Sequence, residues 1–129
     1  MNHHTTDLEC SLCRDKLDTA DPKIADWFLE IKKKFPQAHI SWAYRGKTDQ
    51  NRMFTEGKSR AKFPNSKHNR ELDGKCYSQA LDLFELKGGR AFFDQKFYFA
   101  LNEYSKSLGF PITWGGEFRK IIDYDHFEI

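Results

Sequence analysis

The sequence predicts a small α+β domain with a mainly antiparallel sheet flanked by helices. The chain has 129 residues, of which 39% are apolar, enough to bury one modest core but hardly two. Stretches with the period of a helix and stretches with the period of a strand both occur, and they do not alternate regularly as the units of a parallel sheet would. Residues 1–129 are therefore expected to form a single domain, with 12 Phe, 5 Tyr and 3 Trp supplying ring packing to its core.

The clearest helix is predicted over 21–35, where apolar residues recur on one helical face. Asp21 is placed to cap its first turn, and Pro22 occupies the first helical position, where a missing N–H does no harm. Lys32–Lys34 follow at its end, where cations complement the helix dipole, so these side chains are expected to be solvated.

Two further helices are expected. One begins at Thr48, a suitable cap, and ends at Gly57, while the other covers 93–108 and ends at Gly109. Both ends are assigned to glycine because it readily adopts the left-handed backbone conformation that closes many helices.

Alternation of side chains predicts strands over 38–44 and 80–86. His39 is expected on the solvent side of the first strand. Two short strand-like pieces follow the last helix around a turn at Gly115-Gly116, and the second of them covers 124–129.

A long polar loop with little regular structure is predicted over 58–77. Its cations, Lys58, Arg60, Lys62 and Lys67, form a loose cluster. An ordinary exposed loop is the favoured interpretation, and contact with an anionic wall polymer is the alternative.

The charge pattern excludes several classes of partner. The formal net charge of +2 comes from 21 basic and 19 acidic residues spread along the chain, so no single-signed face for nucleic acid is expected. No apolar stretch approaches the roughly 18 residues of a membrane span, and the segment 1–9 is polar, so neither a membrane anchor nor a signal peptide is expected. These features favour a protein made in a cytoplasm.

The three cysteines argue against a disulfide framework, because their number is odd, and they fit a reducing compartment. Cys10 and Cys13 have the spacing of half a structural zinc site. His3 or His4 and Cys76 would complete such a second metal site only if the fold brought them near. We expect reduced, structural cysteines and keep the second metal as the alternative.

Three residues in unusual contexts are candidates for metal ligands. His68 lies in the polar loop, where a histidine has no core to fill, and Asp82 lies in the middle of an apolar strand. Periodicity alone leaves open whether Asp82 points outward or into a cleft. His126 lies among acids, with Glu128 on its side of an extended segment and Asp123 reaching it only through a bend. Catalytic zinc takes three ligands of these types and keeps one position for water.

Taken together, these residues resemble the zinc D-alanyl-D-alanine carboxypeptidase and L-alanyl-D-glutamate endopeptidase family, which has the hedgehog/DD-peptidase fold and includes many phage endolysins. The blocks that match the family pattern, in its order, are Tyr44-Arg45 with Gln50, Ser66-x-His68, Ala80-x-Asp82, Trp114-Gly115-Gly116 and Asp123-x-x-His126. The resemblance spans about 40–129, and residues 1–20 form an N-terminal extension that carries the Cys-x-x-Cys motif. The chain departs from the common pattern by an insertion at roughly 70–77.

The resemblance implies a role for each matched residue. His68, Asp82 and His126 would bind one zinc ion, and Asp123 would be the general base. Arg45 would bind a substrate carboxylate or the oxyanion of the attacked carbonyl, with a structural salt bridge as the alternative. The residues expected to contact substrate or to orient the ligands are Tyr44, Gln50, Ser66, Trp114 and Glu128.

The implied function is hydrolysis of peptidoglycan stem peptides, first as an L-alanyl-D-glutamate endopeptidase acting as a phage endolysin. Such an enzyme would work as a monomer in the periplasm or cell wall, after holin-type release from the host cytoplasm or delivery by a virion. One alternative is a D-alanyl-D-alanine carboxypeptidase or dipeptidase. Another is a zinc-containing structural domain of a phage particle that keeps the fold without turnover.

Overall fold

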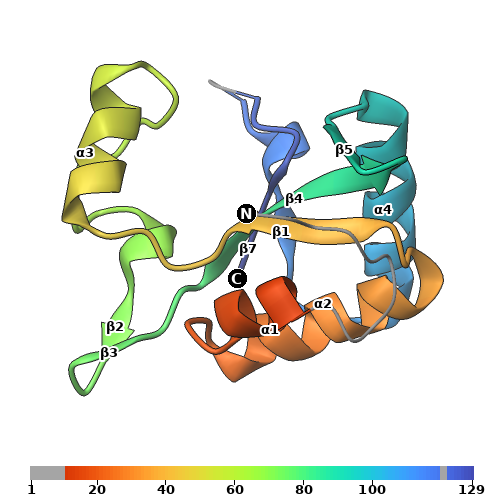
Figure 1. Ribbon diagram of the computed structural model, residues 1–129, viewed down its shortest axis with the longest axis horizontal. Coiled ribbons are helices and arrows are strands. Elements are labelled where there is room, and N and C mark those ends of the chain that lie inside the picture. Colours follow the sequence, from red (N-terminus) through yellow and green to blue (C-terminus); the bar gives the residue numbers. More distant parts are fainter. Residues whose placement is uncertain (1–10, 120–121) are drawn as a thin grey trace.

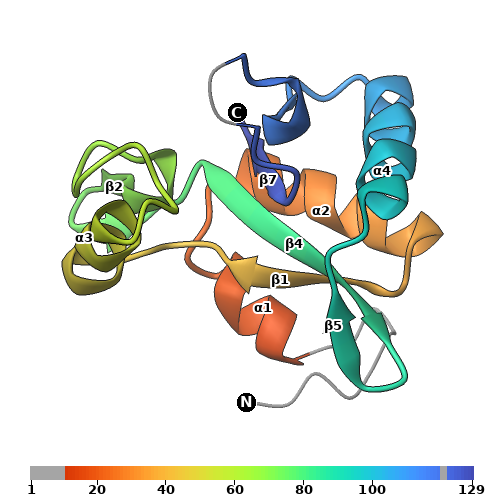
Figure 2. The ribbon, with the colours of Figure 1, turned by 90° about the horizontal axis from the view of Figure 1, so that it is seen from above.

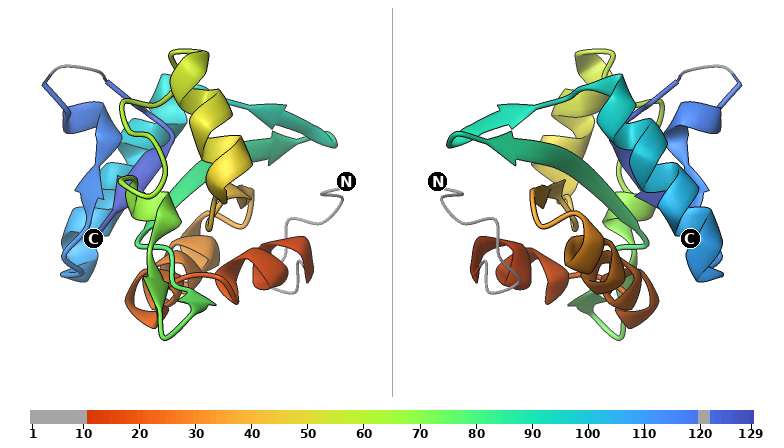
Figure 3. Two further views of the ribbon diagram at one scale, coloured as in Figure 1. Left: turned by 90° about the vertical axis from the view of Figure 1, so that its left-hand side faces the viewer. Right: turned by 90° about the vertical axis from the view of Figure 1, so that its right-hand side faces the viewer.

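A five-stranded antiparallel sheet organises the fold in the computed structural model, which describes residues 11–119 and 122–129 (Figure 1). Its strands are β1 (Ala38–Trp42), β4 (Ala80–Lys87), β7 (His126–Glu128) and β6 (Thr113–Trp114) in spatial order, with β5 (Arg90–Phe92) paired to the end of β4. The sequence did not predict β5, which forms a hairpin with β4 that projects from the body of the domain (Figure 3).

The central strand β4 is buried along almost its whole length because β1 and β7 flank it. Leu81 and Leu83 belong to the main hydrophobic core, and the alternation of the strand therefore turns Asp82 and Phe84 to the other face. The strand predicted over 80–86 is confirmed.

Two long helices, α2 (Pro22–Lys34) and α4 (Gln95–Leu108), bury their apolar faces against the sheet, and α2 packs on both α4 and β1 (Figure 2). The Asp21 side chain accepts a hydrogen bond from the Lys23 backbone N–H at 2.9 Å, so the predicted cap is confirmed. Gly109 closes α4 with a φ of 78°, also as predicted. Neither these helices nor any other in the described ranges combines the length and the apolar character that crossing a bilayer would require.

A short helix that the sequence did not predict, α1 (Ser11–Leu17), packs against β1. Its Cys13 lies in the hydrophobic core, with Sγ 3.4 Å from His39 Nδ1. The prediction that His39 faces solvent is wrong, because α1 covers that side of the strand and leaves the imidazole fully buried.

The environment of Lys32 also differs from the expected one, which was a solvated side chain at the helix end. Its ammonium group is buried and donates hydrogen bonds to the carbonyl oxygens of Pro36 and Ala38, both at 2.7 Å. These acceptors replace water around the charge as the chain turns from α2 into β1. Lys33 and Lys34 are exposed, as expected.

The segment between β1 and β4 stands apart from the sheet, on the left of Figure 1. It contains α3 (Lys47–Thr55), the 3-10 turn η1 (Lys67–Asn69) and a small hairpin of β2 (Glu71–Leu72) and β3 (Lys75–Cys76). Thr48 does not cap α3 as predicted, since Gly46 holds that position without a side-chain bond. The long loop predicted over 58–77 contains its little regular structure in its second half, where η1 and the hairpin form.

The C-terminal part returns to the sheet through β6, the 3-10 turn η2 (Gly115–Glu117) and β7. Gly115 approaches the following loop closely, and its carbonyl oxygen accepts a hydrogen bond from the Asp123 N–H at 2.9 Å. A Cβ built on Gly115 would overlap the carbonyl oxygen of Asp123 and lie 3.0 Å from Cβ of His126. Glycine at this position therefore permits the bend that brings β7 back into the sheet.

Replacing Gly115 with alanine should lower the free energy of unfolding by about 1–3 kcal/mol, because the added methyl overlaps backbone that cannot yield cheaply. Chemical denaturation measures the change. Gly46→Ala is the matched control, since its Cβ would meet no atom within 4 Å, and it should cost less than about 1 kcal/mol. Equal losses in the two variants would contradict this account of Gly115.

Candidate active site

Three predicted metal ligands converge on the sheet face opposite the main core. Asp82 in β4 lies directly across from His126 in β7, and the two share one face as a cross-strand pair. Oδ1 of Asp82 lies 3.1 Å from Nδ1 of His126 and 3.2 Å from Nε2 of His68. All three side chains are buried, so the open question about Asp82 is settled in favour of an inward orientation.

The turn η1 fixes the position of His68. The Ser66 side chain accepts a hydrogen bond from the His68 N–H at 3.2 Å, and the Asn69 side chain accepts one from the Ser66 N–H at 2.9 Å. This reciprocal arrangement is a capping box. The His68 carbonyl oxygen also accepts a bond from the Arg45 N–H at 2.9 Å, which ties the turn to the chain that follows β1.

The outer nitrogen of each histidine faces a further acceptor. His68 Nδ1 lies 2.7 Å from the carbonyl oxygen of Ala43, and His126 Nε2 lies 2.8 Å from Oε1 of Glu128. Both nitrogens of each ring thus face oxygen, although a neutral imidazole has a single N–H. Either a second proton on the ring or a metal ion among the inner nitrogens and Asp82 satisfies these contacts, and a metal ion would bind the inner lone pairs while the outer N–H groups donate.

The donor set fits a metal ion such as zinc. Ligand atoms about 2.0–2.1 Å from a tetrahedral zinc are about 3.3 Å apart, close to the distances that join Asp82 to His68 and His126. The ligand atoms of the three side chains all lie within 4.8 Å of one another. His68, Asp82 and His126 could therefore hold a metal ion.

The charges of the group are strongly interdependent in the absence of a metal. Burial by itself raises the pKa of Asp82, but the charge of His68 and hydrogen bonds from both histidines hold it well below its usual range. Burial alone would lower the pKa of His126, yet hydrogen bonds to Asp82 and Glu128 raise it to about 10. The metal-free site consequently stores a proton on His126.

Asp125 is a site residue that the sequence analysis missed. It lines the cavity, and burial, the charge of Asp82 and a hydrogen bond with Asp123 raise its pKa to about 9. An extended segment over 124–129 would turn Asp125 away from His126. Instead β7 begins only at His126, and a turn closed by the bond from its N–H to the Asp123 carbonyl oxygen at 3.2 Å lets both aspartates reach the cavity.

Arg45 pairs with the second oxygen of the candidate ligand. Its Nη2 donates to Oδ2 of Asp82 at 2.9 Å, its Nη1 donates to Oε1 of Gln50 at 3.1 Å, and its guanidinium lies 4.8 Å from the ring centroid of Trp42. The salt bridge kept as an alternative is therefore formed. Arg45 also lines the cavity, so its role toward substrate stays a prediction.

A cavity of about 590 Å³ opens over the three candidate ligands. Its lining includes the expected Ser66, Asp123 and Glu128. Other lining residues, which the sequence did not select as site residues, include Met53, Lys58, Arg60, Lys67, Phe118 and Asp125. The cavity therefore has a polar floor at the candidate ligands and walls from the segment after α3 and the segment after η2.

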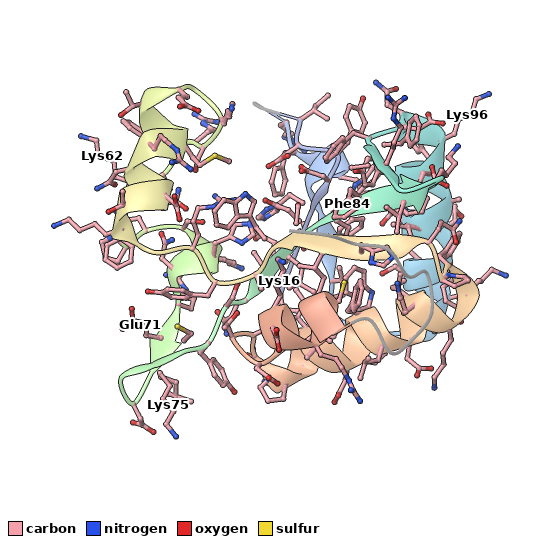
Figure 4. The ribbon with its side chains drawn as sticks, viewed as in Figure 1. Lys16, Lys62, Glu71, Lys75, Phe84 and Lys96 are labelled. Carbon is pink, nitrogen blue, oxygen red and sulfur yellow. The ribbon has the colours of Figure 1, made fainter. Side chains whose placement is uncertain are left out.

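Three of the residues expected to contact substrate or to orient the ligands do not line this cavity. Gln50 is fully buried beneath it and holds Arg45, while Trp114 is buried and donates from Nε1 to the Tyr124 carbonyl oxygen at 2.7 Å. Tyr44 donates its hydroxyl to Glu71 at 2.6 Å, on the β2–β3 hairpin that Figure 4 shows away from the sheet. From these positions we assign Gln50 and Trp114 to structural support of the candidate site.

The cysteine motif is only partly covered by the structure. Cys10, His3 and His4 lie outside the described residues. Cys13 is buried and Cys76 is exposed on β3. Within the described ranges, neither cysteine belongs to a cluster of three potential metal ligands, and the second metal stays a prediction.

The fold and the site define a small α+β domain with a candidate metal centre on its sheet. Among solved structures, the chain is similar to the crystal structure of Serratia marcescens L-Ala D-Glu endopeptidase ChiX, with a TM-score of 0.71 and 19% sequence identity over 91% of this chain and 85% of that chain. No family model matches the chain, and no curated protein matches it. At this identity the likeness shows the fold, and it confirms the predicted α+β class.

Metal binding should release about one proton, because the metal-free protein holds a proton on His126 up to a pKa of about 10 and a bound imidazole must be neutral. Affinity for zinc should then rise by about tenfold per pH unit between pH 7 and 9. Isothermal titration calorimetry in buffers of different ionisation enthalpy measures the released proton. An affinity that does not change with pH would contradict the assignment of His126 as a ligand.

Proposed function

We propose that the chain is a zinc-dependent peptidase that hydrolyses peptidoglycan stem peptides, as an L-alanyl-D-glutamate endopeptidase. The observation that carries the proposal is the convergence of His68, Asp82 and His126 at the floor of an open cavity. The similarity of the fold to a solved L-Ala D-Glu endopeptidase supports the choice of bond. Action as a phage endolysin is the part of the proposal that rests on the family resemblance alone.

The roles of the ligands follow from their hydrogen bonds. His68 would bind the ion through Nε2 and His126 through Nδ1, because Ala43 and Glu128 occupy the opposite nitrogens. Zinc would supply Lewis-acid polarisation of the scissile carbonyl and acidify the attacking water. Arg45 holds the second carboxylate oxygen of Asp82 and so fixes the orientation of this ligand.

Asp123 would act as the general base and then as the general acid. It lines the cavity, and its carboxylate lies within 4.8 Å of those of Asp82 and Asp125. As water attacks the scissile carbonyl carbon, Asp123 would accept its proton, and it would donate that proton to the amine when the carbon–nitrogen bond breaks. The same centre would serve a D-alanyl-D-alanine carboxypeptidase, which differs in the ends of the substrate that the cavity must accept.

Digestion of purified peptidoglycan distinguishes these activities. The zinc-loaded chain should release fragments with a new L-alanine carboxyl end and a new D-glutamate amine end, identified by mass spectrometry. Release of free D-alanine would instead assign the carboxypeptidase. Chain treated with a chelator and dialysed is the control, and the absence of any new ends with zinc bound would overturn the proposal.

Replacing Asp123 with alanine should lower kcat by about 10²- to 10⁴-fold, because a general acid–base group contributes that much. Zinc content, measured by atomic absorption, should stay near one ion per chain, since the three ligands remain. Asp26→Ala removes an exposed carboxylate of α2 and should leave activity unchanged. Full activity in the Asp123 variant would exclude this residue as the base.

A further inference from the structure

The structure divides the loose cluster of cations between 58 and 67 into two groups. Lys58, Arg60 and Lys67 line the cavity above the candidate metal centre. Lys62 is not part of that lining, and its ammonium lies 5.1 Å from the ring centroid of Phe54. Figure 4 shows Lys62 pointing away from the rest of the molecule. One side of the cavity is thus basic, although the sequence favoured an ordinary exposed loop.

We call the three cations on this side of the cavity, Lys58, Arg60 and Lys67, the basic wall. They differ in how far neighbouring acidic groups neutralise their charge. Lys67 lies 3.2 Å from Glu128, the residue that contacts His126, and so belongs to the support of the metal centre. Lys58 lies 3.1 Å from Glu56 in a pair with both side chains largely exposed, which holds the charge only weakly. Arg60 is exposed, and its guanidinium makes no hydrogen bond or ion pair within the part of the chain that the structure describes.

The segment that carries Arg60 is fixed in place by buried polar contacts. The Gln50 amide donates to Oγ of Ser59 at 2.9 Å and to the carbonyl oxygen of Ala61 at 2.7 Å, on either side of Arg60. The Ala61 N–H donates back to Oγ of Ser59 at 3.2 Å. Because Gln50 also holds Arg45, which holds the candidate ligand Asp82, the position of this wall is coupled to that of the metal centre.

The two sides of the cavity have opposite electrostatic effects on an anionic ligand. The floor carries Asp82, Asp123 and Glu128, which repel a carboxylate outside the reach of the metal. The wall after α3 attracts it, and a planar guanidinium suits a carboxylate through two parallel hydrogen bonds. A peptide with its scissile carbonyl at the floor is therefore best placed with a neighbouring carboxylate at Arg60.

We propose that Arg60, assisted by Lys58, binds a free carboxylate on the residue next to the scissile bond, so that the substrates are anionic peptides. This inference rests on the proposed function and adds a specificity determinant to it. In an L-alanyl-γ-D-glutamyl peptide, the glutamyl residue keeps a free α-carboxylate beside the nitrogen of the scissile bond. The wall selects the free acid over its carboxamide.

Two synthetic stem peptides that differ only in this group, carboxylate or carboxamide, test the inference with the zinc-loaded full chain. The wild type should cleave the acid with a kcat/KM about 10- to 100-fold higher, mostly through a lower KM, because hydrogen bonds between charged groups are lost in the amide. The double variant Arg60→Gln, Lys58→Gln should raise KM for the acid to that of the amide and leave the amide unchanged. Lys62→Gln, a cation of the same segment outside the cavity, should change neither.

Binding without turnover provides a second readout. Isothermal titration calorimetry with the Asp123→Ala chain should give the same preference for the acid, and the preference should disappear when Arg60→Gln and Lys58→Gln are added. Circular dichroism and zinc content check that the variants fold and keep the metal.

The outcomes separate this inference from the function on which it rests. Cleavage of both peptides at equal rates by the wild type would overturn the inference and leave the peptidase intact. A double variant that retains the preference, or that loses activity toward both peptides equally, would also overturn it. If neither peptide nor whole peptidoglycan is cleaved, the proposed function itself fails.

Discussion

A carboxylate in the centre of a buried strand is the constraint around which the site is arranged. Asp82 lies in β4 between two other strands, where an unpaired charge would be costly. Its Oδ1 faces the two histidines and its Oδ2 accepts from Arg45, so each oxygen has a cationic or N–H partner. Arg45 in turn is held by Gln50, which fixes the segment after α3. One buried charge thus connects the sheet, the candidate metal centre and the cavity wall.

The antiparallel sheet positions most of the candidate site by itself. The register of β4 with β7 sets Asp82 opposite His126, and Glu128 follows two residues later on the same face of β7, where it contacts the outer nitrogen of that histidine. Only His68 comes from outside the sheet, and it needs a capped turn to hold it. Two of the three candidate ligands are therefore strand residues, which a sheet positions more precisely than a loop would.

The sequence predicted those features that depend on local signals. Asp21 caps α2 and Gly109 closes α4 because caps and left-handed turns are decided within a few residues. His39 and Lys32 were misplaced because their burial depends on α1 and on carbonyl groups that only the folded chain brings near. Asp125 was missed because alternation was extended through a turn. The order of the blocks that resemble the family pattern predicted the candidate ligands, whereas the basic wall could not be predicted without knowing which cations face the cavity.

The segment 70–77, predicted to be an insertion relative to the family that the sequence resembles, leaves the candidate ligands on either side of it close together. It lies within the thirteen residues between His68 and Asp82, which would displace one ligand from the other if they formed an extended link. Instead the β2–β3 hairpin folds back on itself, and the N–H of Tyr77 donates to the carbonyl oxygen of Arg70 at 2.9 Å. The chain therefore enters and leaves the hairpin at nearly one point. No residue of the hairpin lines the cavity, whose walls come from the segment after α3 and from the loop before β7.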